Sequence, residues 1–369
     1  MGKRYLHHSI IEILLNRIRT GLYEPGTKIP KTKELAEEFD TSSVTIDRAL
    51  STLVEQGYLT RKARRGSIIN PRSAWPEARD VKKLSADFYS LLMRDSPSPY
   101  FWKNTIKGMY DAVREHDSDI LSNYIDEDCN AARECVKSLY RKGVKGIIFA
   151  PLSLPNEKIY EEFNAEIINT IRECGISFIL IDRYLKSCDA SYVISRDYEA
   201  AVKLMESLFA AGVKKPLCLT HLYNSPFATR IRGFRDAMKA HGFKESDIEE
   251  RIIEIAPGTI LFNPNNAKAF APLFLNLPDF DGIFTVNAVN LYACVNTLSY
   301  LNEERMQNVR FVNFDDIGPL NISGLVMSAI QESHRIGHLA ADMLVDMIPK
   351  WPDSTFHVVK DYCFKTYNT

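Results

Sequence analysis

Apolar residues near the start of the chain recur at intervals of three and four, the spacing that places them on one face of a helix. This pattern predicts three short helices. Turn residues such as Gly21 and Pro25 follow the first helix, and Gly57 follows the third. After the third helix, two short apolar arms flank a basic turn, which predicts a β-hairpin. Three helices and a hairpin make a winged helix-turn-helix, whose third helix reads a major groove of DNA. The predicted helices cover residues 8–20, 31–39 and 41–56, and the hairpin covers 58–70.

The charge distribution favours DNA contact by this first segment only. Residues 1–72 hold 13 basic and 8 acidic side chains, a net charge of +5, whereas the rest of the chain carries −6. A small basic segment joined to an acidic one suits an anionic polymer partner for the basic part. The first turn of the third helix, Ser42 to Arg48, is short and polar, and the basic turn of the hairpin can reach phosphates. A solvated charge stays the alternative for each basic residue.

Residues 71–83 combine two prolines with high charge and predict a linker, in which we expect Trp75 to dock on a domain surface. From residue 84 onward, strand and helix patterns alternate, and several strands are apolar on both faces, as helix-covered parallel strands are. Repeated βα units predict an α/β, doubly wound body with two sheets. We expect a first lobe at about 84–197 and 332–349, and a second at 198–331 and 350–369. Predicted strands cover 86–93, 120–125, 145–152, 177–184, 215–222, 251–256, 282–288, 309–316 and 357–365, and predicted helices cover 99–116, 129–144, 164–176, 198–213, 229–243, 267–277, 290–302 and 333–348.

Several classes of protein are disfavoured by the same sequence. No apolar run approaches the ~18 residues of a membrane span, and the mixed charges of the first 20 residues argue against a signal peptide. The seven cysteines lack CxxC spacing and indicate reduced thiols in the cytoplasm. Because the sequence has no glycine-rich phosphate loop, metal-ligating cluster or nucleophile motif, we expect no cofactor, no metal and no enzymatic activity.

The stretches GLYEPGTKIP, KELAEEFD, TSSVTIDRAL and GYLTRKARRG follow one another with characteristic spacing. In this order they resemble the DNA-binding domain of the GntR family of bacterial transcription regulators. The chain departs from the family pattern, because two arginines of the recognition helix fall on Ser43 and Asp47, and a wing glycine falls on Arg64. Phosphate would repel Asp47, and we expect Arg48, Arg64 and Arg65 to compensate. The resemblance, with the charge pattern, implies DNA contacts from Lys33, Ser42, Ser43, Thr45, Arg48, Arg61, Arg64, Arg65 and Gly66.

In the body, SPYFWKNTIKGMYDAV, GISFILIDRYL, ATRIRGFRDAMKAHGF, VRFVNFDDIG and SHRIGHLAADML occur in order. Together they resemble the effector domain shared by lac-repressor-type regulators and periplasmic sugar-binding proteins. This resemblance implies a ligand between two lobes, where acceptors, fork donors and an aromatic plate would hold a monosaccharide. Without it, we would favour a cap or turn role for an Asp after a buried strand, and a surface ion pair for the Arg. The implied ligand-binding residues are Phe101, Asp182, Arg183, Arg230, Asn287 and Asp315, with Asn123 as a weaker candidate.

A GntR-type head on such a body is similar to the arabinose-repressor subgroup of the family. That similarity implies a repressor that a monosaccharide releases from double-stranded operator DNA. We expect a homodimer, because one winged helix reads only a half-site. Two alternatives stay open, namely a regulator whose body binds a nucleobase or a phosphorylated metabolite, and an enzyme that kept a DNA-binding head.

Overall fold

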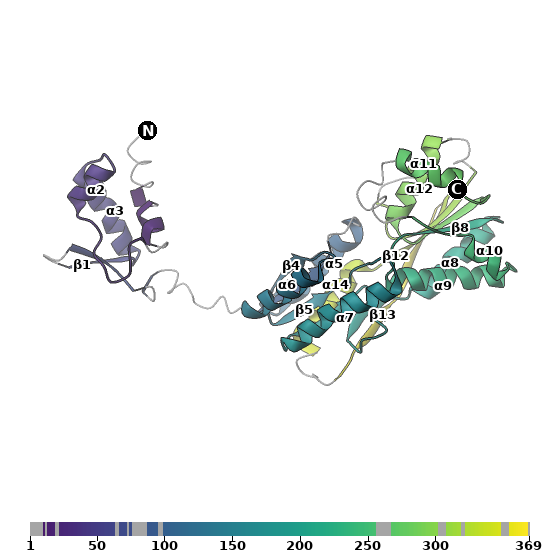
Figure 1. Ribbon diagram of the computed structural model, residues 1–369, viewed down its shortest axis with the longest axis horizontal. Helices are drawn as coiled ribbons and strands as arrows, with labels where there is room; N and C mark the ends of the chain where they lie inside the picture. Colours follow the sequence, from purple (N-terminus) through teal and green to yellow (C-terminus); the bar gives the residue numbers. More distant parts are fainter. Residues whose placement is uncertain are drawn as a thin grey trace. The chain divides into compact units, whose positions relative to one another are not determined.

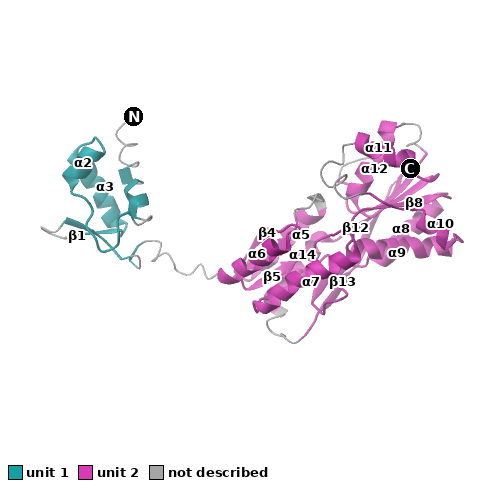
Figure 2. Ribbon diagram, viewed as in Figure 1, with its two compact units in different colours: residues 1–86 teal, residues 87–369 magenta. Residues whose placement is uncertain are grey.

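Two compact units make up the chain, residues 1–86 and 87–369 (Figure 2). None of the described helices is long and apolar enough to cross a membrane. The computed structural model describes residues 10–11, 13–18, 22–62, 66–71, 74–75, 87–94, 99–255, 267–301, 308–318, 322–347 and 354–367.

The first unit contains the three helices and the hairpin that its hydrophobic pattern predicts. Helical residues between 10 and 18 precede α2 (Thr32–Glu38) and α3 (Ser43–Glu55), and β1 (Leu59–Lys62) pairs antiparallel with β2 (Gly66–Ile69). The apolar stripes of the helices meet in one core, since Leu14, Leu35, Ile46 and Leu53 are fully buried. Such burial is the main source of stability for a domain of this size.

Trp75 belongs to the core of this unit, although it lies beyond the hairpin. Its ring packs 5.9 Å from that of Tyr58, and its Nε1–H donates to the carbonyl of Asn70 over 2.7 Å. The expectation that Trp75 docks on a domain surface is therefore confirmed. Most of the other residues of the predicted linker lie outside the described ranges.

The second unit is an α/β body with two six-stranded sheets of the same strand order (Figure 1). Apolar clusters cover both faces of each sheet, which confirms the doubly wound class. The first sheet has the order β13 (His357–Lys360), β7 (Tyr192–Ser195), β6 (Ser177–Ile181), β5 (Gly146–Phe149), β3 (Phe88–Met93) and β4 (Asp119–Tyr124), and the second has the order β14 (Tyr362–Thr366), β12 (Leu325–Gln331), β11 (Arg310–Phe314), β10 (Gly282–Thr285), β8 (Pro216–Thr220) and β9 (Ile252–Glu254).

Helices flank these sheets, and the described pairs of strands are parallel except β12 with β14. The first lobe carries α5 (Pro99–Glu115), α6 (Cys129–Arg141), α7 (Glu157–Glu173) and α14 (Ser333–Asp342), which continues into a π-helical turn at Met343–Met347. The second lobe carries α8 (Asp197–Ala210), α9 (Ser225–Ala240), α10 (Glu245–Glu249), α11 (Ala267–Leu275) and α12 (Ala288–Leu301).

The strand predictions fail where the chain passes between the lobes, at residues 195–197, 331–333 and 360–362. Strands β7 and β12 were not predicted. The single strand expected at 357–365 is two strands, and β13 pairs with β7 in the first lobe. Assigning all of 350–369 to the second lobe was therefore wrong. The half-exposed edge strand β13, HVVK, has no continuous apolar run to reveal its place.

Helices α5 and α14 lie against each other through two glycines. A Cβ atom on Gly108 would lie 1.9 Å from the carbonyl oxygen of His334, and one on Gly337 would lie 1.9 Å from that of Thr105. Only glycine permits this approach. The contact fixes α5, whose first turn carries Phe101 and Trp102 at the edge facing the second lobe.

Candidate functional site

The first turn of α3 forms an exposed surface at the head. The side chain of Ser42 caps the helix by accepting from the N–H of Thr45, which satisfies one of the free donors of the first turn. Its hydroxyl also lies 2.9 Å from that of Thr45. Ser43, Val44, Asp47 and Arg48 are exposed, so this turn can enter a groove of DNA.

Asp47 forms an ion pair with the wing. The Arg61 Nη2 atom lies 2.8 Å from Asp47 Oδ1 and also donates to the Asp47 carbonyl over 3.3 Å. The pairing indicates how an acid is tolerated in the recognition helix, because Arg61 offsets part of its charge. Among the other predicted contacts, Lys33 is exposed on α2 and Gly66 adopts φ +84° at the start of β2. Arg64 and Arg65 lie outside the described residues.

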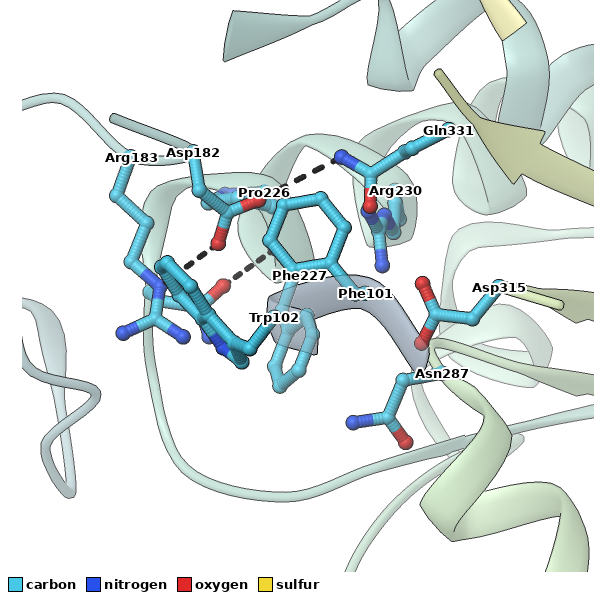
Figure 3. A pocket seen from close by; sticks show the side chains of 11 residues that line it. Phe101, Trp102, Asp182, Arg183, Pro226, Phe227, Arg230, Asn287, Asp315 and Gln331 are labelled. Atoms are coloured by element: carbon cyan, nitrogen blue, oxygen red, sulfur yellow. Dashed lines mark hydrogen bonds and ion pairs between the residues drawn. The ribbon is translucent and has the colours of Figure 1, made fainter. Parts of the chain in front are cut away.

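A small cavity of about 60 Å³, open to solvent, lies between the lobes of the body (Figure 3). All six ligand-binding residues expected from the resemblance line it, although they come from widely separated segments. Asn123 does not, because its amide donates to Ser90 Oγ on the neighbouring strand. The lining residues are Phe101, Trp102, Asp182, Arg183, Asn224, Pro226, Phe227, Arg230, Asn287, Asp315 and Gln331.

Asp182 and Asp315 occupy equivalent places in the two lobes. Asp182 follows β6 and Asp315 follows β11, and these two strands hold the same position in their six-stranded sheets. Both residues have a positive φ, which is 66° for Asp182 and 76° for Asp315. Aspartate adopts this left-handed conformation more readily than most residues. In Figure 3 the Phe101 ring lies between the two carboxyl groups. The cavity therefore has one carboxyl from each lobe and an aromatic face between them.

Arg230 is held by a buried network behind the cavity. Its Nε donates to Asp197 Oδ1 over 2.7 Å, its Nη1 to the Val286 carbonyl over 2.6 Å, and its Nη2 to the Tyr362 hydroxyl over 2.7 Å. The same hydroxyl donates to Asp197 Oδ1 over 2.7 Å. These bonds use three of the five N–H groups of Arg230. Asp197 and Tyr362 begin α8 and β14, next to two of the passages between lobes.

Burial sets the electrostatics of the site. It raises the pKa of Asp182, although Arg183 and Arg230 oppose the shift, and it raises the pKa of Asp315 against Arg230 and the Ala288 N–H. Burial alone would lower the pKa of Arg230, but Tyr362 and the nearby carboxylates reverse the shift, so it stays charged. These carboxyl groups are largely removed from solvent and therefore gain from any hydroxyl that donates to them.

Amide side chains complete the lining. Asn287 accepts the N–H of Asn290 in the first turn of α12, and Asn224 accepts that of Phe227 as the cap of α9. In both residues the cap uses the side-chain oxygen, so the amide nitrogen is left to donate to another group. Asn287 is therefore both the cap of α12 and a residue that lines the cavity.

Polar contacts join the two lobes around the cavity. Gln331 donates to Ser195 Oγ over 2.8 Å and reaches Asp182 over 3.5 Å. Asn224 donates to Ser153 Oγ over 2.9 Å, and the Tyr184 N–H donates to Ser225 Oγ over 3.0 Å. The relative position of the lobes therefore depends on side chains that also touch the cavity.

Sequence reasoning missed Trp102, Asn224, Pro226, Phe227 and Gln331. Gln331 ends β12 and Asn224 follows β8, so both lie at the carboxyl ends of strands, where ligands bind in this fold. Recognising β12 would have identified Gln331. Trp102 neighbours the predicted Phe101, and their rings meet edge-on with centroids 5.0 Å apart.

A winged helix-turn-helix unit and a two-lobed α/β body with a cavity at its strand ends together define a class, the ligand-responsive DNA-binding regulators. Residues 87–361, well over half of the chain, match the family described as periplasmic binding proteins and sugar binding domain of LacI family. Residues 6–69 match the bacterial regulatory proteins of the gntR family. The chain belongs to the first family, carries a GntR-type head, and is a transcription regulator rather than an enzyme.

Similar proteins agree with this assignment. The chain is 22% identical over 350 residues to the arabinose metabolism transcriptional repressor of Geobacillus stearothermophilus, covering 91% of this chain and 89% of the relative. The transcriptional regulator CelR in complex with cellobiose has a TM-score of 0.64 at 16% identity, covering 92% and 99% of the two chains. A LacI family regulator of Enterococcus faecium with bound ribose has a TM-score of 0.60 at 17% identity, covering 76% and 97%. These two structures establish the fold.

Proposed function

We propose that the protein is a cytoplasmic repressor that a neutral monosaccharide releases from its operator. One observation carries the proposal. The cavity between the lobes combines an acidic acceptor from each lobe, Asp182 and Asp315, with the fork donor Arg230 and the aromatic ring of Phe101. A sugar ring presents hydroxyl groups around its edge and C–H groups on its faces, and this set matches both.

Each polar residue has a proposed role. Asp182 and Asp315 accept from sugar hydroxyls, Arg230 donates with its two remaining N–H groups, and the Asn287 amide donates to a further oxygen. Arg183 borders the cavity, with its Nε 3.3 Å from Asp182 Oδ2, and its Nη1 donates to the Pro151 carbonyl. It orients Asp182 and leaves the cavity mouth to the ligand.

The chemistry favours a neutral ligand over a phosphorylated one. A phosphate bound here would lie close to the carboxyl groups of Asp182 and Asp315, which line the same cavity as the two arginines and would repel its charge. A nucleobase would stack on Phe101 or Trp102 without using both carboxyl groups as acceptors. We therefore place a polyol first and keep the other two classes as outcomes of the test.

Release from DNA follows from lobe geometry. A sugar that contacts Asp182 in one lobe and Asp315 and Arg230 in the other stabilises the arrangement of the lobes in which all three contacts form. We propose that the body forms a homodimer and that the ligand changes the spacing of the two heads on a palindromic operator. The required coupling is modest, since a free energy of roughly 1–3 kcal/mol changes DNA affinity about 5- to 150-fold.

A thermal-shift screen of the full chain tests the ligand class. A ligand at 100 times its Kd stabilises the folded body by about 2.7 kcal/mol, which corresponds to a rise in Tm of roughly 5–10 °C. Neutral pentoses and hexoses are the main set, starting with arabinose, which the name of the Geobacillus relative suggests. Sugar phosphates and nucleobases are the comparison sets.

The controls are neighbouring substitutions. Asp315→Asn should abolish the shift, whereas Asp316→Asn should keep it, because Asp316 accepts the Gly318 N–H and does not line the cavity. A shift with a sugar phosphate or nucleobase alone would overturn the proposed ligand and leave the regulator assignment intact.

A further inference from the structure

The exposed face of α3 carries an unusual pair of residues for a DNA-reading helix. Val44 is 64% exposed in the first turn, and the Asp47 side chain is 57% exposed one turn later. A single exposed valine is common on protein surfaces. Its position is informative here, because the first residues of a recognition helix contact base edges.

Helix geometry gives the two side chains a spacing close to that of neighbouring base pairs. Residues three apart are rotated by roughly 60° about the axis and separated by about 4.5 Å along it. This separation is close to the rise of one base pair, about 3.4 Å. Val44 and Asp47 thus share one face, and a helix seated in the major groove directs them at adjacent steps.

The ion pair with the wing makes Asp47 suitable for base contact. Arg61 occupies Oδ1 at 2.8 Å, while Oδ2 has no partner among the described residues. The ion pair reduces the repulsion between this carboxylate and the phosphates, and its second oxygen stays an acceptor. In the major groove, cytosine offers the N4 amino group as a donor to Asp or Glu, and thymine offers a methyl group to apolar side chains.

We propose that α3 reads a T·A pair next to a C·G pair, with Val44 against the thymine methyl and Asp47 Oδ2 on the cytosine amino group. Arg61 holds the carboxylate in place and offsets its charge. The inference rests on the proposed operator binding and adds the class of base step that the operator contains. It also assigns Arg61 a positioning role instead of the phosphate contact expected from its charge.

Selection of binding sites from randomised double-stranded DNA, with the full chain, tests the assignment to Asp47. The variants are Asp47→Asn and, as a control of equal charge change, Glu55→Gln, which lies exposed at the end of the same helix. Both variants should bind all DNA more tightly through reduced repulsion. Only Asp47→Asn should lose the preference for C·G at one position, where wild type discriminates roughly 5- to 100-fold.

Deoxyuridine tests Val44, because it differs from thymidine in the base by the methyl group alone. On the selected site, replacing the thymine next to the specified cytosine should weaken wild type several-fold and leave Val44→Ala unaffected, which is a double-mutant cycle across the interface. An unchanged base preference in Asp47→Asn, or equal losses in both proteins with deoxyuridine, would overturn the inference. Failure of wild type to enrich any sequence would instead refute the operator binding on which it rests.

Discussion

The hydroxyl of Tyr362 joins the ligand-facing Arg230 to the passage between the lobes. It accepts from Arg230 Nη2 and donates to Asp197 Oδ1, both over 2.7 Å, in surroundings where all three side chains are buried. Tyr362→Phe removes this hydroxyl and changes the volume little. It therefore tests whether the network, and not the packing of the ring, stabilises the body.

The expected loss follows from the two bonds. Hydrogen bonds to charged groups contribute roughly 1.5–3 kcal/mol each. In the variant, Asp197 still accepts from Arg230 Nε, and Arg230 Nη1 still donates to the Val286 carbonyl, so these bonds compensate part of the loss. We expect a decrease in the free energy of unfolding of about 3 kcal/mol, equivalent to roughly 5–10 °C in Tm.

Tyr367→Phe is the matched control. It makes the same substitution just beyond the end of β14, where the hydroxyl of Tyr367 is buried without a partner in the described part of the chain. This change should be neutral or slightly stabilising, since it removes an unsatisfied polar group. Urea titrations of wild type and both variants give the comparison. A loss below about 0.5 kcal/mol for Tyr362→Phe, or equal losses in the two variants, would refute the reasoning.

Further predictions concern the charges of the body. Because burial raises the pKa of Asp182 and Asp315, their ionised forms oppose folding as pH rises from the unfolded pKa towards the higher folded one. Asp182→Asn and Asp315→Asn should therefore raise Tm at pH 7 without ligand while removing the ligand-induced shift, as measured by calorimetry. Burial lowers the pKa of His221 to about 4, so stability should fall by about 3 kcal/mol as pH drops from about 6.5 to 4. In urea titrations, His221→Gln should flatten this dependence, and an unchanged slope would assign the acid sensitivity to other groups.

The elements that a regular hydrophobic pattern predicts are present. The stripe of Ile46 and Leu53 predicts α3, and the apolar run of Ile147 to Phe149 predicts the buried β5. These patterns are local and reflect burial on one or both faces. Strands β7 and β12 were not predicted because they mix buried with partly exposed positions, unlike fully buried runs such as β5 and β8. Both strands end where the chain passes between the lobes. Because the strands were not predicted, the polar residues at their ends, Ser195 and Gln331, were not recognised either.

Short motifs predicted six of the eleven cavity residues, and the resemblance implied that they meet between two lobes, but the contacts among the cavity residues could not be predicted. Nothing local in the sequence brings Asp182 beside Gln331, since the contact depends on the second passage of the chain between the lobes. Likewise, the pairing of Asp47 with Arg61 depends on how the hairpin folds back on α3. The sequence alone suggested repulsion at Asp47, and the tertiary contact shows the charge that offsets it.

The most direct test of the central claim is the affinity of the full chain for its selected operator, measured by fluorescence anisotropy with and without neutral monosaccharides. The account predicts that one sugar raises the Kd for DNA at least about fivefold, and that Asp182→Asn and Asp315→Asn abolish this effect while still binding the operator. DNA affinity that responds to no neutral monosaccharide, but responds to a sugar phosphate or a nucleobase, would contradict it.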